Sequence, residues 1–353
     1  MKVLFYVRAN HQEVRGGDLV QLFSTGQALE EHGIEIDYKS DPKLNLSKYE
    51  LVHIFNSPRF EETKSFFENA LSQQKPIAFS TIYWSKDELA VGVAKSKKVQ
   101  AAAKLFGVPV AKFLWRNLKS LQTLGRSNHD SVIEKWLFEH ATVLLPNSEG
   151  EMREIERIYK LNNRDYGVVR NAISTSLFAK TPQLKRQHSV LSVGRIERRK
   201  NTLKLIEACK NLGYKLILIG ALDQKDEYGL ECSNKIKEYG FNYLPNVDQK
   251  DLIPYYYTAK AHAIVSWYET PGLSSMEAAC GGCNIVSTDR GSTREYFGDM
   301  VEFCDPFSIK SIEQALRAAM HKKNSLQLRN KIMKEYTWEG AARDTIKAYN
   351  KII

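Results

Sequence analysis

The sequence lacks the features that mark several large classes of protein. Its longest apolar runs, LILIGAL at 216–222 and AIVSW at 263–267, fall far short of the roughly 20 residues that cross a bilayer. The five cysteines all follow position 200, which is too few for a disulfide framework and predicts free thiols in a reducing compartment. The glycine pattern G-x-G-x-x-G is absent, which disfavours a nicotinamide or flavin dehydrogenase. The opening MKVLFYVRAN does not read as a signal peptide, so we expect a first β-strand and a cytoplasmic protein.

Length and charge predict a two-domain globular protein with anionic partners. Chains beyond about 250–300 residues tend to split into domains, and this chain has 353 residues. Apolar residues make up 43% and charged residues 26%, which excludes a disordered, collagen-like or fibrous chain. The net charge of +10 favours nucleic acid, an anionic membrane surface or phosphorylated substrates. The segment 90–128 holds no acidic residue at all.

Short apolar runs alternate with amphipathic segments, and this pattern restarts once. The first series of expected strands is 3–7, 34–38, 51–55, 76–81, 142–146 and 167–170. The second series is 189–194, 215–220, 241–244, 262–267, 284–288 and 300–304, with helices expected at 201–212, 226–239, 249–259 and 308–323. Such alternation predicts parallel sheets covered by helices on both faces.

The restart divides the chain into two doubly wound α/β domains. The polar stretch TPQLKRQ at 181–187 marks the boundary between them. We therefore predict an N-terminal Rossmann-like domain over 1–180, a C-terminal one over 186–335 and a final helix over 336–353. Ligands of such sheets bind beyond the carboxyl ends of the strands, so two facing domains are expected to enclose an interdomain cleft.

The most informative segment is WYETPGLSSMEAAC, which starts at Trp267. An apolar strand leads to Glu269, a turn follows at Gly272, and Ser274 opens a helix that contains Glu277. A strand, a glycine turn and a helix start together form an anion site, because free N–H groups and the helix dipole favour a phosphate. The flanking carboxylates suit sugar hydroxyls, since each accepts hydrogen bonds from a vicinal diol. A buried strand–helix junction with two solvated glutamates explains the segment alone equally well.

Two further loops carry glycine or paired cations. In GRIERRKN, Gly194 permits a tight exit from the first strand of the second domain, and Arg195 and Lys200 could neutralise a diphosphate. Taken alone, the run is better explained as a solvated basic stretch. In the N-terminal domain, Gly16 and Gly17 lie between the first strand and the first helix, where glycine permits close approach to an anion or sugar. A simple turn explains that pair as well.

These three segments, in this order and spacing, resemble the retaining glycosyltransferases of family 4, which have the GT-B fold of two facing Rossmann-like domains. The resemblance covers nearly the whole chain, and its strongest element is Glu269-x7-Glu277 within ETPGLSSMEA, with GR-x4-K upstream. It implies an enzyme that moves a hexose from a nucleotide diphosphate sugar to a glycan or lipid-linked acceptor, in bacterial-type surface polysaccharide or glycolipid synthesis.

The resemblance also implies roles for individual residues. Glu269 would lie beside the donor hexose as a catalytic residue, and Arg195 and Lys200 would bind the diphosphate leaving group. Glu277 would hold the ribose hydroxyls. The remaining residues of the nucleotide-sugar site would be Gly16, Gly17, Gly194, Gly272, Leu273 and Ser274. The segment 245–247 would meet the nucleobase, 171–172 would lie near the interdomain crossing, and the helix with Trp338 would cross back onto the N-terminal domain.

One departure concerns a histidine that family members often carry after the fourth strand. This sequence reads STIYWSKDE there, so Tyr83 or Trp84 stands at that position. His53 in LVHIF is a possible substitute that fits a core histidine better, and His11 in the first loop is a further candidate.

The mechanism implied by the resemblance retains the configuration of the anomeric carbon without a covalent intermediate. The departing diphosphate would be stabilised by Arg195, Lys200 and the helix start. No Asp-x-Asp occurs, so no metal or other cofactor is expected. A UDP-sugar is the first expectation for the donor and a GDP-sugar the second.

Two features stay outside that scheme. Cys280 and Cys283 have redox-like spacing, but with no second Cys or His pair nearby we interpret them as buried structural thiols. The basic stretch 95–126 carries an apolar stripe, so it is either an ordinary helix with a solvated basic face or a patch that docks on anionic lipid at the inner face of the membrane.

The alternatives to a glycosyltransferase come from two classes. A GT-B nucleotide-sugar epimerase or a phosphorylase would keep the fold, although no lysine-bound cofactor motif supports a phosphorylase. A nucleic-acid-binding protein would use the charge of +10, but the basic residues are not interleaved with a stacking platform. We therefore expect no nucleic-acid partner.

Overall fold

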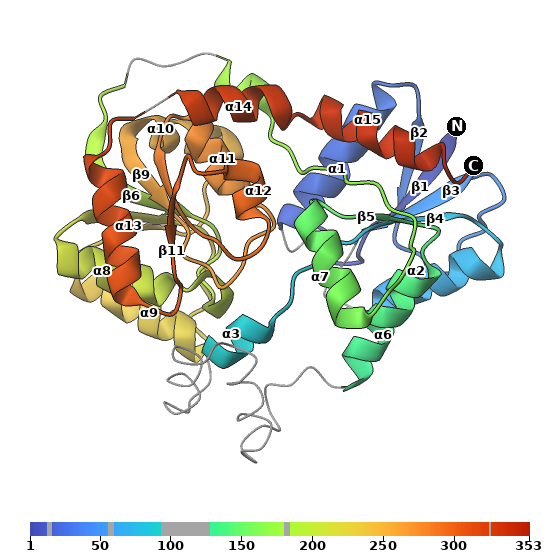
Figure 1. Ribbon diagram of the computed structural model, residues 1–353, viewed down its shortest axis with the longest axis horizontal. Coiled ribbons are helices and arrows are strands. Elements are labelled where there is room, and N and C mark those ends of the chain that lie inside the picture. Colours follow the sequence, from blue (N-terminus) through green and yellow to red (C-terminus); the bar gives the residue numbers. More distant parts are fainter. Residues whose placement is uncertain (13–15, 56–59, 93–127, 180–183, 325) are drawn as a thin grey trace. The chain divides into compact units, whose positions relative to one another are not determined.

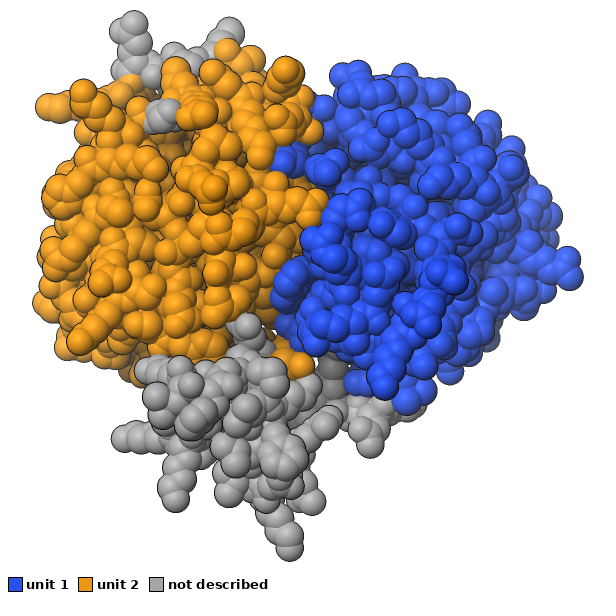
Figure 2. All heavy atoms as spheres, viewed as in Figure 1, with its two compact units in different colours: residues 1–85, 124–172, 336–353 blue, residues 86–123, 173–335 orange. Residues whose placement is uncertain are grey.

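The computed structural model describes residues 1–12, 16–55, 60–92, 128–179, 184–324 and 326–353 (Figure 1). They form two compact units, which Figure 2 shows in different colours. Unit 1 comprises residues 1–85, 124–172 and 336–353, and unit 2 comprises residues 86–123 and 173–335. The division after Ala172 lies upstream of the polar stretch at 181–187, where the sequence predicts the domain boundary. The basic stretch 95–126 lies outside the described residues.

Unit 1 is built on a five-stranded parallel sheet in the order β2-β1-β3-β4-β5. The strands are β1 (Lys2–Tyr6), β2 (Glu35–Lys39), β3 (Leu51–Phe55), β4 (Ile77–Ser80) and β5 (Val143–Leu145). Every residue of β3 and β4 is buried, which is why these strands are mainly apolar apart from His53 and Ser80. The order reverses between β1 and β3, and ligands of doubly wound sheets bind at such switch points.

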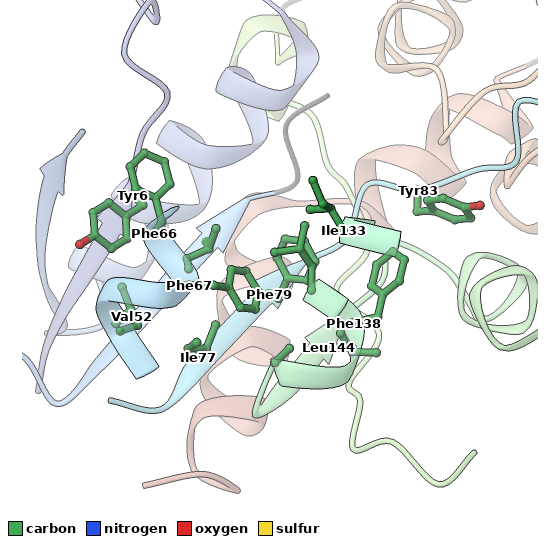
Figure 3. Close-up of a cluster of buried hydrophobic side chains, with 14 of the residues drawn as sticks. Tyr6, Val52, Phe66, Phe67, Ile77, Phe79, Tyr83, Ile133, Phe138 and Leu144 are labelled. Carbon is green, nitrogen blue, oxygen red and sulfur yellow. The ribbon is translucent and has the colours of Figure 1, made fainter. Parts of the chain in front are cut away.

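Helices cover both faces of this sheet. One face packs against α2 (Phe60–Ser72), α6 (Asn128–His140) and α7 (Glu149–Tyr159). Figure 3 shows this cluster, in which the Phe67 ring lies edge-on to the Phe79 ring at 5.0 Å. The other face packs against α1 (Gly17–Glu30) and α15 (Trp338–Tyr349). With both faces covered, only the strand ends and their loops remain for a ligand.

The C-terminal helix α15 is therefore part of the unit 1 core. The Tyr349 hydroxyl lies 2.6 Å from Nδ1 of His53 in β3, and Nε2 of His53 lies 2.8 Å from the Ser80 hydroxyl. His53 is fully buried, and burial lowers its pKa to about 3, so the ring is neutral. His53 is thus a core histidine that joins three elements.

Unit 2 is built on a six-stranded parallel sheet in the order β11-β10-β9-β6-β7-β8. The strands are β6 (Gln187–Val193), β7 (Lys215–Ile219), β8 (Asn242–Leu244), β9 (Ala259–Ala263), β10 (Asn284–Thr288) and β11 (Glu302–Cys304). This is the order of dinucleotide-binding Rossmann folds, with the switch point between β6 and β9. The loops that leave these two strands therefore face one another at the carboxyl edge.

The helices of unit 2 alternate with its strands. They are α8 (Thr202–Leu212), α9 (Glu227–Glu238), α10 (Gln249–Thr258), α11 (Leu273–Cys280), α12 (Thr293–Phe297), α13 (Ile309–His321) and α14 (Gln327–Glu335). Short 3-10 turns cover Thr175–Phe178 and Arg198–Lys200, and α3 (Asp87–Gly92) follows β4. Among the described residues, none of the helices has the length and apolar character to cross a bilayer.

Two predicted strands differ from the structure. Residues 167–170 form no strand, and only a single bridge joins Tyr166 to Leu144. The strand expected at 262–267 is β9 at Ala259–Ala263, and its apolar continuation is buried non-strand chain. The residues that follow β9 are apolar because they are buried in the interior of unit 2, although they form no strand. An apolar run alone therefore does not mark the end of a strand.

Candidate functional site

The loop after β6 carries the GR-x4-K pattern to the switch point of unit 2. Gly194 has a φ of 151°, in the region that favours glycine, and its N–H donates to the Ile219 carbonyl at 2.8 Å. The chain then passes through the 3-10 turn Arg198–Lys200 before α8. This turn directs consecutive cationic side chains to different surroundings, which the spacing in the sequence does not specify.

The loop after β9 lies against that turn. The Trp267 N–H donates to the Arg199 carbonyl at 2.9 Å, and the Glu269 N–H donates to the Arg290 carbonyl at 3.2 Å. Gly272 has a φ of 93° and forms the N-cap of α11, whose first residue is Leu273. The structure thus brings GR-x4-K and ETPGLSSMEA together, although they lie about 70 positions apart.

Glu269 is the centre of a buried ion cluster. Its Oε1 accepts from Lys200 Nζ at 2.7 Å and from Arg199 Nη1 at 3.3 Å, and the residue is only 4% exposed. Burial alone would raise the pKa of this carboxyl, but Lys200 and Arg199 outweigh burial and lower it below its ordinary value. Burial lowers the pKa of Lys200 against the opposing effect of Glu269. The cluster places an ionised carboxylate and two cations at one strand edge.

Arg195 differs from Lys200 in its surroundings. Its side chain is 55% exposed and pairs only loosely with Glu197, at 3.7 Å. It does not take part in the Glu269 cluster. Of the three predicted catalytic residues, the structure thus joins Lys200 and Glu269 directly and leaves the Arg195 guanidinium at the surface of the same loop. An exposed guanidinium there remains accessible to an anion.

The start of α11 supplies backbone donors beside this cluster. The first intrahelical bonds run from Ser275 and Met276 to the Gly272 carbonyl, so the N–H groups of Leu273 and Ser274 precede the helical ladder. The Ser274 hydroxyl donates to the Val193 carbonyl at 2.8 Å, which fixes the helix start against the end of β6. This arrangement favours an anion at the switch point.

Glu277 lies one turn into α11 and already accepts two hydrogen bonds. Its Oε1 accepts from Gln249 at 2.7 Å, and its Oε2 accepts from the Tyr256 hydroxyl at 2.8 Å. Burial raises the pKa of this carboxyl, and the two hydrogen bonds oppose the effect. Each oxygen keeps a further lone pair, so the carboxylate can still accept from a diol.

Sequence reasoning missed several residues that complete this site. The sequence shows Arg199 only as one member of a basic run. No sequence pattern indicates that Gln249 and Tyr256 of α10 bind Glu277. His262 is fully buried in β9, where its Nε2 accepts from the Val193 N–H at 3.3 Å. Burial lowers the pKa of His262 to about 3, so it acts as a neutral acceptor.

The predicted residues of unit 1 lie at the carboxyl edge of its own sheet. Gly16 is the N-cap of α1, and Gly17 is its first residue. A Cβ on Gly16 would lie 2.3 Å from Oδ1 of Asp18, whose Oδ2 accepts from Arg8 at 2.9 Å. The glycine therefore permits the Arg8–Asp18 pair to close at the helix start, where a negative charge is favoured.

The positions after β4 do not replace the expected histidine. Tyr83 is 3% exposed, and its ring lies edge-on to Phe138 at 5.5 Å, so it belongs to the core (Figure 3). Trp84 is half-buried. His11 is a loop residue whose Nδ1 lies 3.0 Å from the Arg8 carbonyl.

The remaining predicted positions fall as follows. Residues 245–247 follow β8 at the carboxyl edge of unit 2, and Asn171 and Ala172 are buried at the end of unit 1. Cys280 and Cys283 are buried free thiols, and burial raises the pKa of each to about 12. Within the described residues, the structure has no group of three or more His, Cys, Asp or Glu side chains suited to a metal ion.

One protein-family model matches the part of the chain that contains this cluster. Residues 174–337, which contain the whole switch-point cluster, match the model of the family "Glycosyl transferases group 1". Over residues 174–337 the chain is therefore similar to a group 1 glycosyl transferase domain. A similar curated protein is the N-acetylgalactosamine-N,N'-diacetylbacillosaminyl-diphospho-undecaprenol 4-alpha-N-acetylgalactosaminyltransferase of Campylobacter jejuni, 26% identical over 251 residues. That match covers 64% of this chain and 62% of the relative, so the chain spans about six tenths of the relative's length.

Solved structures extend the likeness over the whole chain. The sucrose-phosphate synthase of Thermosynechococcus elongatus has a TM-score of 0.76 at 16% identity, with 99% of this chain and 98% of that chain covered. A trehalose-6-phosphate structure from E. coli, bound with UDP-2-fluoro glucose, has a TM-score of 0.69 at 9% identity and covers both chains completely. At such identities the likeness concerns the fold. The predicted α/β class of GT-B type, with two Rossmann-like units, is confirmed.

Proposed function

We propose that the protein is a retaining glycosyltransferase that moves a hexose from a nucleotide diphosphate sugar to a glycan or lipid-linked acceptor. The observation that carries this proposal is the ion cluster of Glu269, Lys200 and Arg199 beside the start of α11, at the β6/β9 switch point. The segment that is similar to a group 1 glycosyl transferase domain contains all of these residues. The Campylobacter relative is named for a diphospho-undecaprenol substrate, which supports a lipid-linked acceptor in surface polysaccharide or glycolipid synthesis.

The donor would be held by charge at one end and by hydroxyl contacts at the other. The diphosphate would bind Lys200, Arg195 and the free N–H groups at the start of α11, as cations and helix starts both favour phosphate. Glu269 would then exchange part of its ion pairing for hydroxyls of the hexose. Glu277, oriented by Gln249 and Tyr256, would accept from the ribose diol.

The reaction would proceed on one face of the sugar. The acceptor oxygen bonds to the anomeric carbon as the bond from that carbon to the diphosphate oxygen breaks. The electron pair of the broken bond goes to the diphosphate, and the acceptor proton passes to a diphosphate oxygen on the same face. Lys200 and the helix start would stabilise the negative charge of the leaving group, which makes a metal ion unnecessary in this proposal.

Two further parts of the proposal concern the base of the donor and the place where the enzyme acts. A UDP-sugar is the first candidate, because the E. coli structure of the same fold holds UDP-2-fluoro glucose, and a GDP-sugar is the second. Action at the inner face of the membrane would rest on the basic stretch 95–126, whose net positive charge would favour anionic lipid. Replacement of Lys112, Arg116 and Lys119 by Glu should then weaken co-sedimentation with anionic vesicles, and unchanged binding would remove the membrane proposal.

A thermal-shift screen against UDP, GDP, ADP and their sugar conjugates tests the donor. A ligand at about a hundredfold excess over its Kd should stabilise the protein by about 3 kcal/mol. Transfer to an acceptor, followed by NMR of the anomeric proton with and without EDTA, tests retention and metal independence. Conversion of the nucleotide sugar into its epimer without any acceptor would favour the epimerase instead.

A further inference from the structure

The backbone after β4 in unit 1 adopts an unusual conformation. Ile82 has a φ of 42°, which is a genuine outlier for a β-branched residue. Such a conformation costs on the order of 1–3 kcal/mol and persists only where the surroundings enforce it. The segment Thr81–Tyr83 directly follows the carboxyl end of β4, on the edge where ligands of doubly wound sheets bind. The strain therefore falls on a potential ligand-binding loop.

A buried carboxylate holds both neighbours of Ile82. Oε1 of Glu151 accepts from the Tyr83 N–H at 2.7 Å and from the Thr81 hydroxyl, and Oε2 accepts from the Asn147 N–H at 2.9 Å. Glu151 and Thr81 are fully buried. An ionised carboxylate only accepts hydrogen bonds, so it matches a cluster of converging donors. The carboxylate thus fixes the chain on each side of the strained residue.

The contacts of this carboxylate extend beyond the cap of α7. Ser148 is the N-cap of α7 and its hydroxyl accepts from the Glu151 N–H at 2.9 Å. In a capping box the glutamate would bond the N–H of the cap residue itself. Glu151 also bonds the N–H of Asn147, one residue before the cap, and reaches the segment after β4.

The same hydrogen-bond chain continues through Gln21 to Asn171, one of the predicted positions of unit 1. Asn147 Oδ1 accepts from Gln21 Nε2 at 2.8 Å, and Gln21 Oε1 accepts from Asn171 Nδ2 at 3.0 Å. Gln21 lies on α1 just after the Gly16-Gly17 start, and all three side chains are at most 4% exposed. The chain therefore links the loops that follow β1, β4 and β5 at one edge of the sheet. Buried hydrogen-bond networks of this kind rigidify the segments they join.

We propose that Glu151 is a positioning residue that holds Thr81–Tyr83 in the conformation in which unit 1 binds the acceptor. This inference rests on the proposed glycosyl transfer, in which unit 2 binds the donor. A buried carboxylate is a costly way to pack a core, and apolar residues would serve packing as well. The coincidence of that carboxylate with the strained Ile82 gives it a task that packing alone does not explain.

The test is Glu151→Gln, which keeps the shape and removes the charge. The amide can present only one oxygen to donors that now meet both ends of the carboxylate, so one N–H loses its acceptor. We expect the KM for the acceptor to rise at least about tenfold while kcat changes much less, because misplacement of a binding loop mainly weakens binding. The Kd of the nucleotide sugar should stay unchanged, and hydrogen exchange at residues 81–84 should become faster.

Glu134→Gln is the matched control. Glu134 is also a buried carboxylate of unit 1, and it accepts from the Tyr159 hydroxyl within the packed helices α6 and α7. This variant should lose stability yet keep the acceptor KM. Thr81→Val, which removes one donor and leaves the backbone contacts of Glu151, should raise the KM less than Glu151→Gln.

Equal acceptor KM values for the Glu151→Gln and Glu134→Gln variants, in an active enzyme, would overturn the inference. Faster exchange at 81–84 without a change in KM would overturn it too, because the segment would then be held for stability alone. Failure of the proposed function has a different signature, namely that the wild-type protein neither binds nor turns over a nucleotide sugar.

Discussion

The carboxyl edges of the two sheets are built from opposite kinds of chemistry. In unit 2, two cations and a carboxylate meet at the switch point beside a helix start. In unit 1, the loops are joined by a buried hydrogen-bond chain of amides around one carboxylate. Paired cations at a strand edge are suited to bind and stabilise a diphosphate, whereas a buried hydrogen-bond chain fixes the geometry of the loops it joins. The two units thus separate charge stabilisation from positioning.

The largest expected effect follows from removal of the charge in unit 2. Lys200→Ala should reduce kcat by about a hundredfold to a thousandfold, as loss of a preorganised donor to a developing anion does in other enzymes. Glu269→Ala should likewise abolish transfer. Lys210→Ala is the control, because Lys210 is an exposed cation on α8 outside the cluster. Turnover retained in both the Lys200 and Glu269 variants would overturn the site assignment.

A third substitution, Glu269→Gln, tests the buried ion cluster as a structural element. It leaves Lys200 without its carboxylate partner, while Arg199 keeps its ion pair with Glu197, and breaking a buried pair costs about 3–5 kcal/mol. We expect that loss in the free energy of unfolding measured by urea denaturation. The Gln variant of Glu197, whose side chain is only partly buried, should lose far less.

A smaller effect is expected at the ribose contact. Glu277→Ala should weaken nucleotide binding about tenfold to a hundredfold, because hydrogen bonds to a charged group contribute about 1.5–3 kcal/mol. Calorimetric titration with the nucleoside diphosphate measures it. Gln249→Ala removes only an orienting partner of that carboxylate and should weaken binding less. Equal affinity of the wild-type and Glu277→Ala proteins would show that Glu277 does not bind the ribose.

The smallest effect concerns the acid side of the pH profile. Lys200 and Arg199 lower the pKa of Glu269 below its ordinary value of 4.5, so the carboxylate stays ionised at lower pH than a free one. The contribution of the ionised carboxylate to activity is therefore lost only as the pH falls through the lowered pKa. Arg199→Gln removes one of these two cations and should shift the acidic limb of kcat/KM toward higher pH. Arg199→Lys should restore most of the wild-type profile. An unchanged acidic limb in the Arg199→Gln variant would show that Arg199 does not lower the pKa of the Glu269 carboxylate that governs activity.

Much of the fold could be predicted because its signal is local. The runs LVHIF and NIVST are strands with the predicted bounds, since both are rich in β-branched and other apolar residues and are buried along almost their whole length. The strand expected at 262–267 was misplaced because the buried chain after β9 is as apolar as the strand itself. Residues 167–170 are apolar for the same reason, as they pack beside β5 without joining the sheet.

The site could be predicted only in part. The switch-point rule brings the loops after β6 and β9 together, which is enough to expect Lys200 near Glu269. It does not say which arginine faces the carboxylate, because the 3-10 turn at Arg198–Lys200 sets that direction. The bonds from Gln249 and Tyr256 to Glu277 depend on the packing of α10 against α11, and no local pattern records that packing.

Isothermal titration of the wild-type and Lys200→Ala proteins with UDP, GDP and their hexose conjugates tests the central claim most directly. The account predicts that one nucleotide series binds the wild-type protein and that Lys200→Ala weakens the diphosphate at least about tenfold, with Lys210→Ala unchanged. Equal affinities in the wild-type and Lys200→Ala proteins, or no binding of any nucleotide to the wild-type protein, would contradict it.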